Sequence, residues 1–276
     1  MIPIHIVHQA GKTEIGAFGQ KLDLTAAAKN VHFGTAGRII VAGLLALIGA
    51  GAIIATMWGG TGLLLREPEP SAHPGVNQPW LGANATQLAL QLESDDNEIY
   101  RERQHIASLL AQQPGDRIAV VGAGSGFFAE ELARRTGSGG VVTAVEINPE
   151  LVQMISTRAS RLGLSNLRAH EGLETKLNIN RRDGGNFDLI VLPDSYHHLE
   201  YPKSMLHSFD RLLRRRGQLV VIERQIGPDA PPQLAEHVRL NQQQVIAEIT
   251  AQGFELVAQP TAPFLKDFYI LRFRKD

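Results

Sequence analysis

The distribution of apolar and polar residues shows one long uncharged stretch near the N-terminus. Residues 39–65 contain no Asp, Glu, Lys or Arg, and residues 39–58 are almost all apolar. A helix rises about 1.5 Å per residue, so a segment of this length can cross a hydrocarbon core about 30 Å thick. A buried core helix would show a polar face, and an ordinary secretory signal would begin closer to the N-terminus. The sequence therefore predicts a transmembrane helix over residues 39–58.

The charged residues on the two sides of this helix predict its orientation. Those before it are mainly basic: Lys12, Lys21, Lys29 and Arg38 against Glu14 and Asp23. The nearest ones after it are Arg66, Glu67 and Glu69. Because Lys and Arg are enriched in the cytoplasmic flanks of transmembrane helices, we expect the N-terminus to lie in the cytoplasm. The large C-terminal domain is then expected in the periplasm.

The predicted helix and the tail before it indicate protein partners in the membrane. Ala42, Ala46 and Ala50 recur every four residues, which lets a second transmembrane helix approach closely, although the same alanines could equally face lipid. The N-terminal tail, residues 1–38, opens with the alternating segment MIPIHIVH, typical of a short strand, and then shows no clear period. A polar tail is seldom ordered alone. We therefore expect other membrane-protein subunits to bind the helix and the tail.

After the helix, a linker leads to one folded domain. The linker, residues 59–83, is expected to be stiff and extended because of Pro68, Pro70, Pro74 and Pro79. From residue 84 to residue 276, short apolar runs alternate with helical stretches, which predicts parallel strands joined by crossover helices. The last two runs, FELVAQ and DFYILRFR, have no helix between them and must pair as a hairpin. The pattern predicts a doubly wound α/β domain whose mostly parallel seven-stranded sheet includes a C-terminal antiparallel hairpin strand.

Composition and charge exclude several classes of function. The 27 Lys and Arg residues balance 28 Asp and Glu residues, so the chain lacks the basic field that holds nucleic acid. The absence of cysteine excludes thiolate metal sites and a cysteine nucleophile. His197 and His198 are adjacent, so their side chains point in different directions, and no third ligand stands at a metal spacing. We therefore predict neither a nucleic-acid partner nor a metal site.

The clearest chemical motif follows the first strand of the domain. Gly122, Gly124 and Gly126 alternate with other residues in the segment GAGSGF, and glycines allow a backbone to turn tightly and approach a ligand. Glu146 ends the next strand, where its carboxylate can accept hydrogen bonds from both hydroxyls of a ribose. The same carboxylate could instead cap the helix that opens at Asn148. The motif predicts a nucleoside site at the carboxyl edge of the sheet.

Several segments carry a resemblance to a known family. AVVGAGSGFFAEELARRTG and FDLIVLPDSYHHLEYPKSMLHSFDRLLRRRGQLVVIE, together with the closing hairpin, resemble class I S-adenosylmethionine-dependent methyltransferases. The segment LESDDNEIYRERQHIASLL resembles a bacterial branch of methyltransferase-like proteins, many of which carry an export or anchor segment. The resemblance extends over the chain from the LESDDNEIY segment to the C-terminus, and it implies S-adenosylmethionine as the cofactor.

The resemblance also implies roles for individual residues. The implied cofactor-binding residues are Gly122, Gly124, Gly126, Glu146 and Glu171. Glu146 would bind the ribose hydroxyls, and the region of Glu171 would contact the adenine. Asp194 and Tyr196 follow the fourth strand, would line the mouth for methyl donor and acceptor, and are the candidate catalytic residues. Asp194 could also simply cap the turn that follows it.

Two functions are consistent with this resemblance. The first is methylation of an unknown acceptor by a membrane-anchored enzyme. The second is a catalytically inactive, methyltransferase-like subunit that stabilises a larger membrane complex of the electron-transport type. Three features favour the second function. Val120 stands where the family has an acidic residue that binds the methionine ammonium, and the expected export would separate the domain from the cytoplasmic cofactor. The N-terminal tail is also expected to need a partner.

Overall fold

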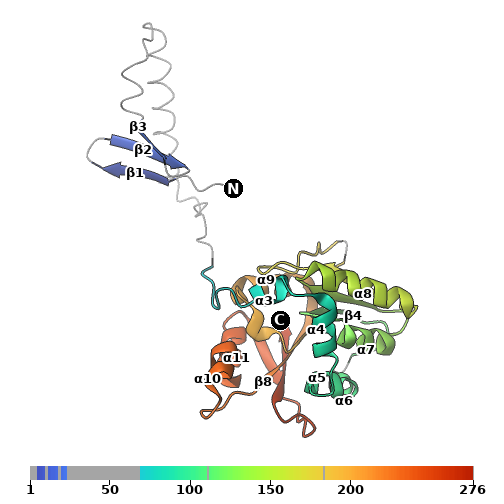
Figure 1. The fold of residues 1–276 in the computed structure, drawn as a ribbon. Coiled ribbons are helices and arrows are strands. Elements are labelled where there is room, and N and C mark those ends of the chain that lie inside the picture. The colour runs from blue at the N-terminus through green and yellow to red at the C-terminus, as the bar shows by residue number, and fades with distance from the viewer. Residues whose placement is uncertain are drawn as a thin grey trace. The chain divides into compact units, whose positions relative to one another are not determined.

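The computed structural model describes residues 5–9, 12–17, 20–23, 69–110, 112–182 and 184–275. The chain divides into two compact units, Met1–Glu67 and Pro68–Asp276, and we describe each by itself (Figure 1). Among the described residues, no helix combines the length and the apolar composition needed to cross a membrane. The predicted transmembrane helix over residues 39–58, with its alanine stripe, lies outside those residues.

The described part of the first unit is a small antiparallel sheet. Its strands are β1 (His5–Gln9), β2 (Lys12–Ala17) and β3 (Gln20–Asp23), in that spatial order. Gln9 pairs with Lys12, and Ala17 pairs with Gln20, so only two residues separate each pair of neighbouring strands. Connections of this length are typical of hairpins. The sequence predicts one short strand here, and the structure adds β2, which pairs with it, and β3, which pairs with β2.

The second unit is built on a seven-stranded sheet. Its strands are β4 (Arg117–Val121), β5 (Val141–Glu146), β6 (Leu167–Glu171), β7 (Phe187–Pro193), β8 (Leu213–Arg224), β9 (Phe254–Ala258) and β10 (Phe268–Lys275). The spatial order is β6-β5-β4-β7-β8-β10-β9. Within this sheet β10 runs antiparallel to both β8 and β9, while the other pairings are parallel. This confirms the predicted doubly wound sheet with its antiparallel hairpin strand.

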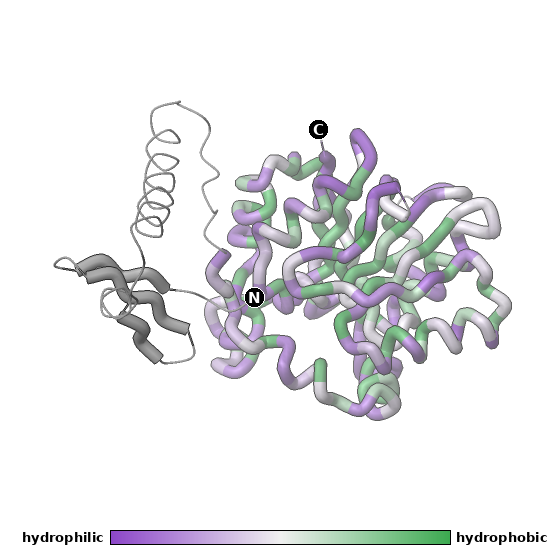
Figure 2. Tube along the Cα trace, turned by 90° about the horizontal axis from the view of Figure 1, so that it is seen from above, coloured by the Kyte–Doolittle hydropathy of each residue, from purple (hydrophilic) through white to green (hydrophobic). Residues whose placement is uncertain are grey.

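The two faces of the sheet are covered by different helices. The helices along this unit are α3 (Gln78–Leu81), α4 (Ala85–Leu92), α5 (Glu98–Arg101), α6 (Arg103–Leu109), α7 (Phe127–Thr136), α8 (Pro149–Arg161), the 3-10 helix η1 (Tyr196–His198), α9 (Pro202–Leu212), α10 (Pro232–His237) and α11 (Gln242–Thr250). Ile118 and Val120 of β4 pack with α6, α7 and α8. Ala119 and Val121 pack on the opposite face with α9 and α11. Because successive side chains of a strand point to opposite faces, the buried run RIAVV serves both cores. Figure 2 shows these hydrophobic segments inside the unit.

The second unit begins before the predicted boundary at residue 84. The carboxylate of Glu69 accepts hydrogen bonds from the backbone N–H groups of Lys203 and Ser204, at 2.8 and 2.7 Å. The N–H of Ala72 donates to the backbone oxygen of Glu200 at 2.8 Å. Instead of a free extended linker, the described part of 59–83 therefore packs against the domain, because polar side chains and the short helix α3 give it partners there.

Candidate functional site

A cavity of about 520 Å³ lies at the carboxyl ends of β4, β5, β7 and β8. This is the edge where open α/β sheets bind ligands, and the volume falls within the range of about 300–1,000 Å³ found for small-molecule sites. The wall includes the loop after β4, the end of β5, the segment after β7, and residues of α5 and α10. The topology thus brings segments far apart in sequence to one place.

The glycine loop after β4 forms part of the wall. Gly122 has φ +66°, and a Cβ atom there would lie 2.5 Å from Cβ of Ser195. Gly124 has φ +54°, and a Cβ atom there would lie 2.8 Å from Leu92. Both line the cavity, whereas Gly126 does not. Gly126 has φ +87°, occupies the N-cap position of α7 and faces Ile155, so its predicted cofactor contact is wrong and its role is to let α7 pack on α8.

Glu146 holds the glycine loop from the end of β5. Its Oε2 accepts a hydrogen bond from the N–H of Gly124 at 2.8 Å, and its Oε1 accepts from the N–H groups of Ile147 and Asn148 at 2.8 and 3.1 Å. Burial raises the pKa of Glu146, and these three hydrogen bonds oppose that rise. The side chain of Asn148 caps the helix α8. Glu146 therefore does not have the alternative capping role. Glu146 lines the cavity.

The neighbouring strand β6 contributes different residues from those predicted. Glu171 is exposed at the end of β6 and is not among the residues that line the cavity. The lining residues there are Gly172, Leu173 and Glu174. Glu171 itself therefore lies outside the cavity wall, whereas the residues directly after β6, in the predicted region of Glu171, line it. An apolar side chain, Leu173, occupies the place expected to contact adenine.

The two candidate catalytic residues point to different places. Asp194 lines the cavity, with Oδ2 at 2.8 Å from a guanidinium nitrogen of Arg224. Its side chain does not cap η1. Tyr196 is 1% exposed, belongs to the core on the α9 and α11 face, and donates its hydroxyl proton to Glu248 of α11 at 2.7 Å. The prediction that Tyr196 lines the mouth is wrong, because its ring is turned into the core.

A buried histidine–carboxylate pair lies beside Asp194. Nδ1 of His197 is 2.9 Å from Glu223, and the carboxylate also accepts a hydrogen bond from the N–H of His197 at 3.0 Å. Burial alone would lower the pKa of His197, but the charge of Glu223 and the hydrogen bond to it outweigh burial and raise it. Burial alone would raise the pKa of Glu223, but His197 outweighs it and holds this pKa below the usual range. The pair therefore fixes one nitrogen of the His197 ring and leaves Nε2 available.

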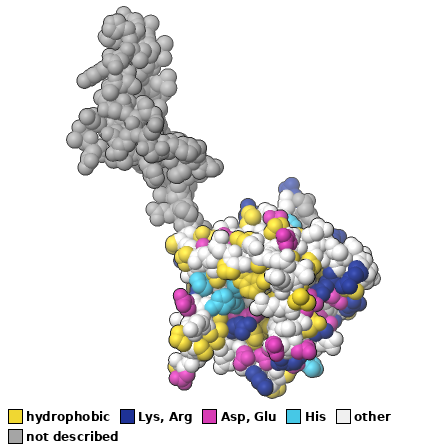
Figure 3. Space-filling view, in the orientation of Figure 1, with side chains coloured by type: hydrophobic (Ala, Val, Ile, Leu, Met, Phe, Trp, Pro, Cys, Tyr) yellow, Lys and Arg dark blue, Asp and Glu magenta, His cyan; other side chains and the backbone are white. Residues whose placement is uncertain are grey.

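His197 belongs to a group of three histidines, His197, His198 and His237, which we call the histidine cluster. The ring centroids lie 4.3 to 5.1 Å apart. Burial, followed by the neighbouring His197 and His237, lowers the pKa of His198 to about 2, and burial also lowers that of His237. All three residues line the cavity. Figure 3 shows histidine side chains gathered on one face of this unit, beside hydrophobic and basic ones.

The third member of this cluster, His237, was not predicted from the sequence. His237 ends α10 and stands 39 positions after His198, with β8 between them. No local spacing connects the two residues, so the expectation that the adjacent histidines lack a third partner is wrong. The only signal in the sequence is the presence of a histidine in the segment after β8, the strand that supplies Glu223.

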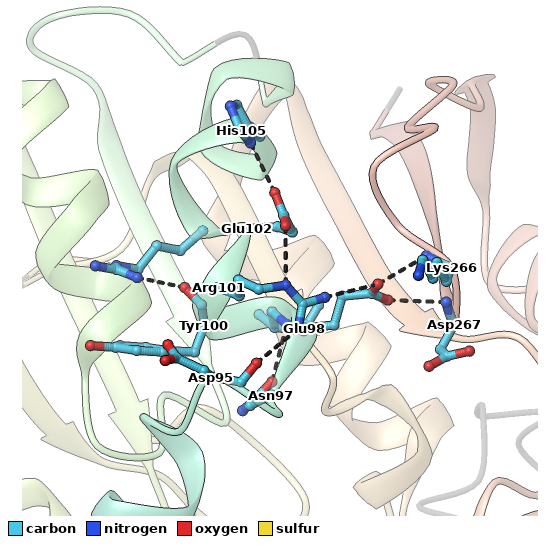
Figure 4. Close-up of polar contacts among 11 residues, drawn as sticks. Asp95, Asn97, Glu98, Tyr100, Arg101, Glu102, His105, Lys266 and Asp267 are labelled. Carbon is cyan, nitrogen blue, oxygen red and sulfur yellow. Dashed lines mark hydrogen bonds and ion pairs between the residues drawn. The ribbon is translucent and has the colours of Figure 1, made fainter.

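The wall on the side of α5 is held by Glu98. Its two carboxylate oxygens accept hydrogen bonds from the backbone N–H groups of Lys266 and Asp267, each at 3.0 Å, as Figure 4 shows. Arg101 lies 3.4 Å from the same carboxylate. Glu98 and Asp267 line the cavity. These contacts join α5 to the loop before β10, so the N-terminal helices form a fixed wall rather than a separate segment.

Val120 lies away from the cavity. Its side chain is completely buried and packs in the apolar core between β4 and the helices α7 and α8. It is not among the lining residues, whereas the carboxylates of Asp96, Glu98 and Asp194 are. The missing acidic residue at position 120 therefore leaves a cavity that still contains carboxylates.

The sheet order, the glycine loop and the cavity at the carboxyl ends of the strands are those of an α/β domain of the class I methyltransferase type. The family model described as "Methyltransferase domain" matches residues 113–261, which is more than half of the 276 residues. The chain therefore belongs to the methyltransferase domain family. A search of curated proteins found no match.

Solved structures show the same fold at low sequence identity. An S-adenosylmethionine-dependent methyltransferase from Aquifex aeolicus is 19% identical, with a TM-score of 0.60, over 70% of this chain and 98% of that one. The [4+2]-cyclase SpnF is 18% identical, with a TM-score of 0.57, over 75% of this chain and 97% of that one. The mitomycin 7-O-methyltransferase MmcR is 13% identical, with a TM-score of 0.56, over 71% and 61%. Since one of these proteins is a cyclase, the fold alone does not identify the reaction.

Proposed function

We propose that this protein binds S-adenosylmethionine in the cavity and catalyses transfer of its methyl group to a small acceptor beside the histidine cluster. One observation supports this most directly. A single cavity is lined both by the glycine loop and Glu146 and by Asp194, Arg224 and the histidine cluster. A donor and an acceptor could therefore be held in line in the same cavity, which is the main contribution of an enzyme to such a transfer.

The residues at the nucleoside end fit this cofactor. Gly122 and Gly124 line the cavity, and their positive φ angles let the loop turn so that its backbone can face a ligand, while Ser195 and Leu92 pack where Cβ atoms would otherwise lie. A carboxylate has about four acceptor positions, and Glu146 uses three of them on backbone N–H groups. The remaining position can accept a ribose hydroxyl proton. The cofactor, when bound, supplies an electrophilic methyl group on a sulfonium.

The other end of the cavity favours an acceptor with an oxygen atom. Arg224 is partly exposed there and can bind an anionic or carbonyl oxygen, while Asp194 holds its guanidinium in place. The ring of Phe268, 4.8 Å from the Arg224 guanidinium, can cover the carbon skeleton. We therefore propose a partly apolar acceptor that carries a hydroxyl, carboxyl or carbonyl group.

Calorimetric titration of the full chain in detergent with S-adenosylmethionine tests this proposal. Glu146→Ala should abolish measurable binding, because the carboxylate both holds Gly124 and would bind the ribose. Glu171→Ala is the matched control, since Glu171 ends the adjacent strand but is exposed outside the cavity, and it should bind like the wild type. Absence of binding by the wild type, or equal loss in both variants, would refute the proposal.

The structure weakens one argument for the alternative function, that of an inactive subunit. It depends on Val120, and that residue lies in the core, away from the carboxylates that line the cavity. The second argument for this alternative is export of the domain. A reporter fused after Asp276 tests this directly, because the proposed activity needs the domain on the cytoplasmic side, whereas the charges before residue 39 predict the periplasmic side. A periplasmic domain would favour the inactive subunit.

We also propose that residues 39–58 anchor the chain in the membrane, as their length and lack of charge indicate. The anchored chain should remain with the membrane fraction after alkaline extraction. A chain that lacks residues 39–58 should be released. If both chains behave alike, the segment is not the anchor, and the proposal of methyl transfer is unaffected.

A further inference from the structure

We propose that His197, His198 and His237 bind a divalent transition-metal ion at the acceptor end of the cavity. The ion site itself does not depend on the proposed methyl transfer. The role of the ion in catalysis rests on the proposed methyl transfer. In that role, the ion would keep one coordination position open toward the cavity and bind an oxygen atom of the acceptor there. This goes beyond methyl-donor binding, since it assigns a ligand set and a class of acceptor atom.

The geometry of the histidine cluster supports the proposal. One ligand nitrogen from each of the three rings lies within 4.8 Å of the other two. An ion with Zn–N bonds of about 2.0–2.1 Å and tetrahedral angles holds its nitrogens about 3.3 Å apart. The rings therefore need to move together by at most about 1.5 Å. His237 is partly exposed at the end of a short helix, where such a movement is easily accommodated.

The surroundings of His197 are those of a metal ligand. Histidines that bind metals almost always donate their other ring N–H to a carboxylate or carbonyl, which orients the ring and raises its basicity. Nδ1 of His197 lies 2.9 Å from the buried carboxylate of Glu223, so Nε2 is the nitrogen left for an ion. A purely structural histidine does not need this arrangement at the wall of a cavity.

His198 supplies a second, independent observation. Its Nδ1 atom is buried and has no hydrogen-bond partner among the described residues. Leaving such an atom unsatisfied costs about 1–3 kcal/mol. The backbone oxygen of His198 accepts a hydrogen bond from Asn77 at 3.2 Å, and its ring meets Trp80 edge-on, so the residue is held in place on both sides. A metal ion would satisfy a ring nitrogen that the protein itself leaves without a partner.

The donor set selects the kind of ion. Three neutral imidazoles suit Zn²⁺, Cu²⁺, Ni²⁺ or Co²⁺ rather than Mg²⁺ or Ca²⁺, which prefer oxygen ligands. Three protein ligands with one open position are also the pattern of catalytic zinc sites. Among these ions we propose Zn²⁺ as the best match. Asp194 lies near the cluster, 4.0 Å from Nδ1 of His197, and pairs with Arg224. Bound at the open position, an acceptor hydroxyl would lose its proton more readily.

Titration of the full chain with Co²⁺ tests the proposal. The protein is purified in detergent without a histidine tag and treated with a chelator, and the visible absorption of four-coordinate Co²⁺ is followed. Zn²⁺ should then displace Co²⁺ and remove the absorption, since it binds nitrogen sites more tightly. His237→Gln should weaken Co²⁺ binding more than about 10-fold, because loss of even an outer-shell partner weakens metal binding about 10- to 100-fold. Glu223→Gln should also weaken Co²⁺ binding, by about 10- to 100-fold.

The matched control is His207→Gln, which removes an exposed histidine of α9 outside the cluster. It should bind Co²⁺ like the wild type. Absence of the Co²⁺ absorption in the wild type, or an equal affinity in His237→Gln, would overturn the proposal. Calorimetry with S-adenosylmethionine on the same preparations separates the two hypotheses. Cofactor binding without Co²⁺ binding would remove only the metal site, and Co²⁺ binding without cofactor binding would remove only the proposed methyl transfer.

Discussion

Nδ1 of His197 lies 2.9 Å from both carboxylate oxygens of Glu223, and the two side chains are 3% and 1% exposed. One residue lies in the segment after β7 and the other near the end of β8. Substitution of either residue should strongly destabilise the protein, because it would leave the other residue buried without a partner. The pair therefore joins two neighbouring strand ends at the place where the cavity begins.

Glu223→Gln should lower the free energy of unfolding by about 1.5–3 kcal/mol, the contribution of a hydrogen bond to a charged group. Glu255→Gln is the control, since Glu255 pairs with Arg274 on the surface and its side chain is 52% exposed. Surface pairs contribute less than about 1 kcal/mol. Urea unfolding measures both. Equal losses in the two variants would show that the buried pair has no special role.

The stabilisation by this pair should depend on pH. His197 has a raised pKa, so its contribution to stability is fully present below pH 6.5, the ordinary pKa of histidine. This contribution is lost as the pH rises through the raised pKa. Glu223 has a lowered pKa, so its contribution to the stability of the native state is fully present above pH 4.5, the ordinary pKa of glutamate. This contribution is lost as the pH falls through the lowered pKa. The difference between wild type and Glu223→Gln should therefore be largest between these two values. Urea unfolding over a pH series, with a chelator present, measures it, and a difference that does not vary with pH would contradict the assignment.

The fold could be predicted because its information is local. The run RIAVV is buried on both faces, as a central parallel strand requires, and the absence of a helical pattern between the last two strands predicted the antiparallel β10. Gly122, Gly124 and Glu146, the predicted site residues that line the cavity, lie at or just after the ends of β4 and β5. Their positions depend on strand order and on little else.

The residues that were misplaced depend on side-chain direction or on distant segments. Tyr196 and His197 are consecutive residues of the 3-10 helix η1, whose tight turn directs the Tyr196 ring into the core and places His197 at the cavity. Glu171 ends β6 and is exposed, whereas the three residues directly after it line the cavity. His237 reaches the site only through tertiary packing of α10. Sequence patterns specify which strand end is near a ligand, but they do not specify which way a side chain points beyond it.

Val120→Asp should destabilise the protein rather than restore cofactor binding. The new carboxylate would lie completely buried among apolar side chains, without a partner. Unpaired burial of a polar group costs about 2–7 kcal/mol and burial of a charge costs more. Val257→Asp makes the same change on the edge strand β9, where the side chain is 36% exposed, and should cost less than about 1 kcal/mol. Urea unfolding compares the two, and a stable Val120→Asp that binds S-adenosylmethionine more tightly would refute this expectation.

Gly122→Ala and Gly163→Ala separate backbone strain from loss of space. Both glycines have φ +66°, but a Cβ atom at position 122 would lie 2.5 Å from Cβ of Ser195, whereas nothing lies within 4 Å at position 163. A non-glycine residue in this conformation costs about 1–2 kcal/mol, so both variants should lose that much.

Gly122→Ala should lose a further ~1–3 kcal/mol from overpacking. The clash also falls on Ser195, whose hydroxyl donates a hydrogen bond to the backbone oxygen of Val121 at 2.8 Å. The displaced loop would therefore deform the part of the cavity lined by Gly122 and Ser195. Urea unfolding measures the two losses, and calorimetry with S-adenosylmethionine should show weaker binding only for Gly122→Ala. Equal stability and equal binding in the two variants would mean that the close approach of Gly122 to Ser195 does not shape the cavity.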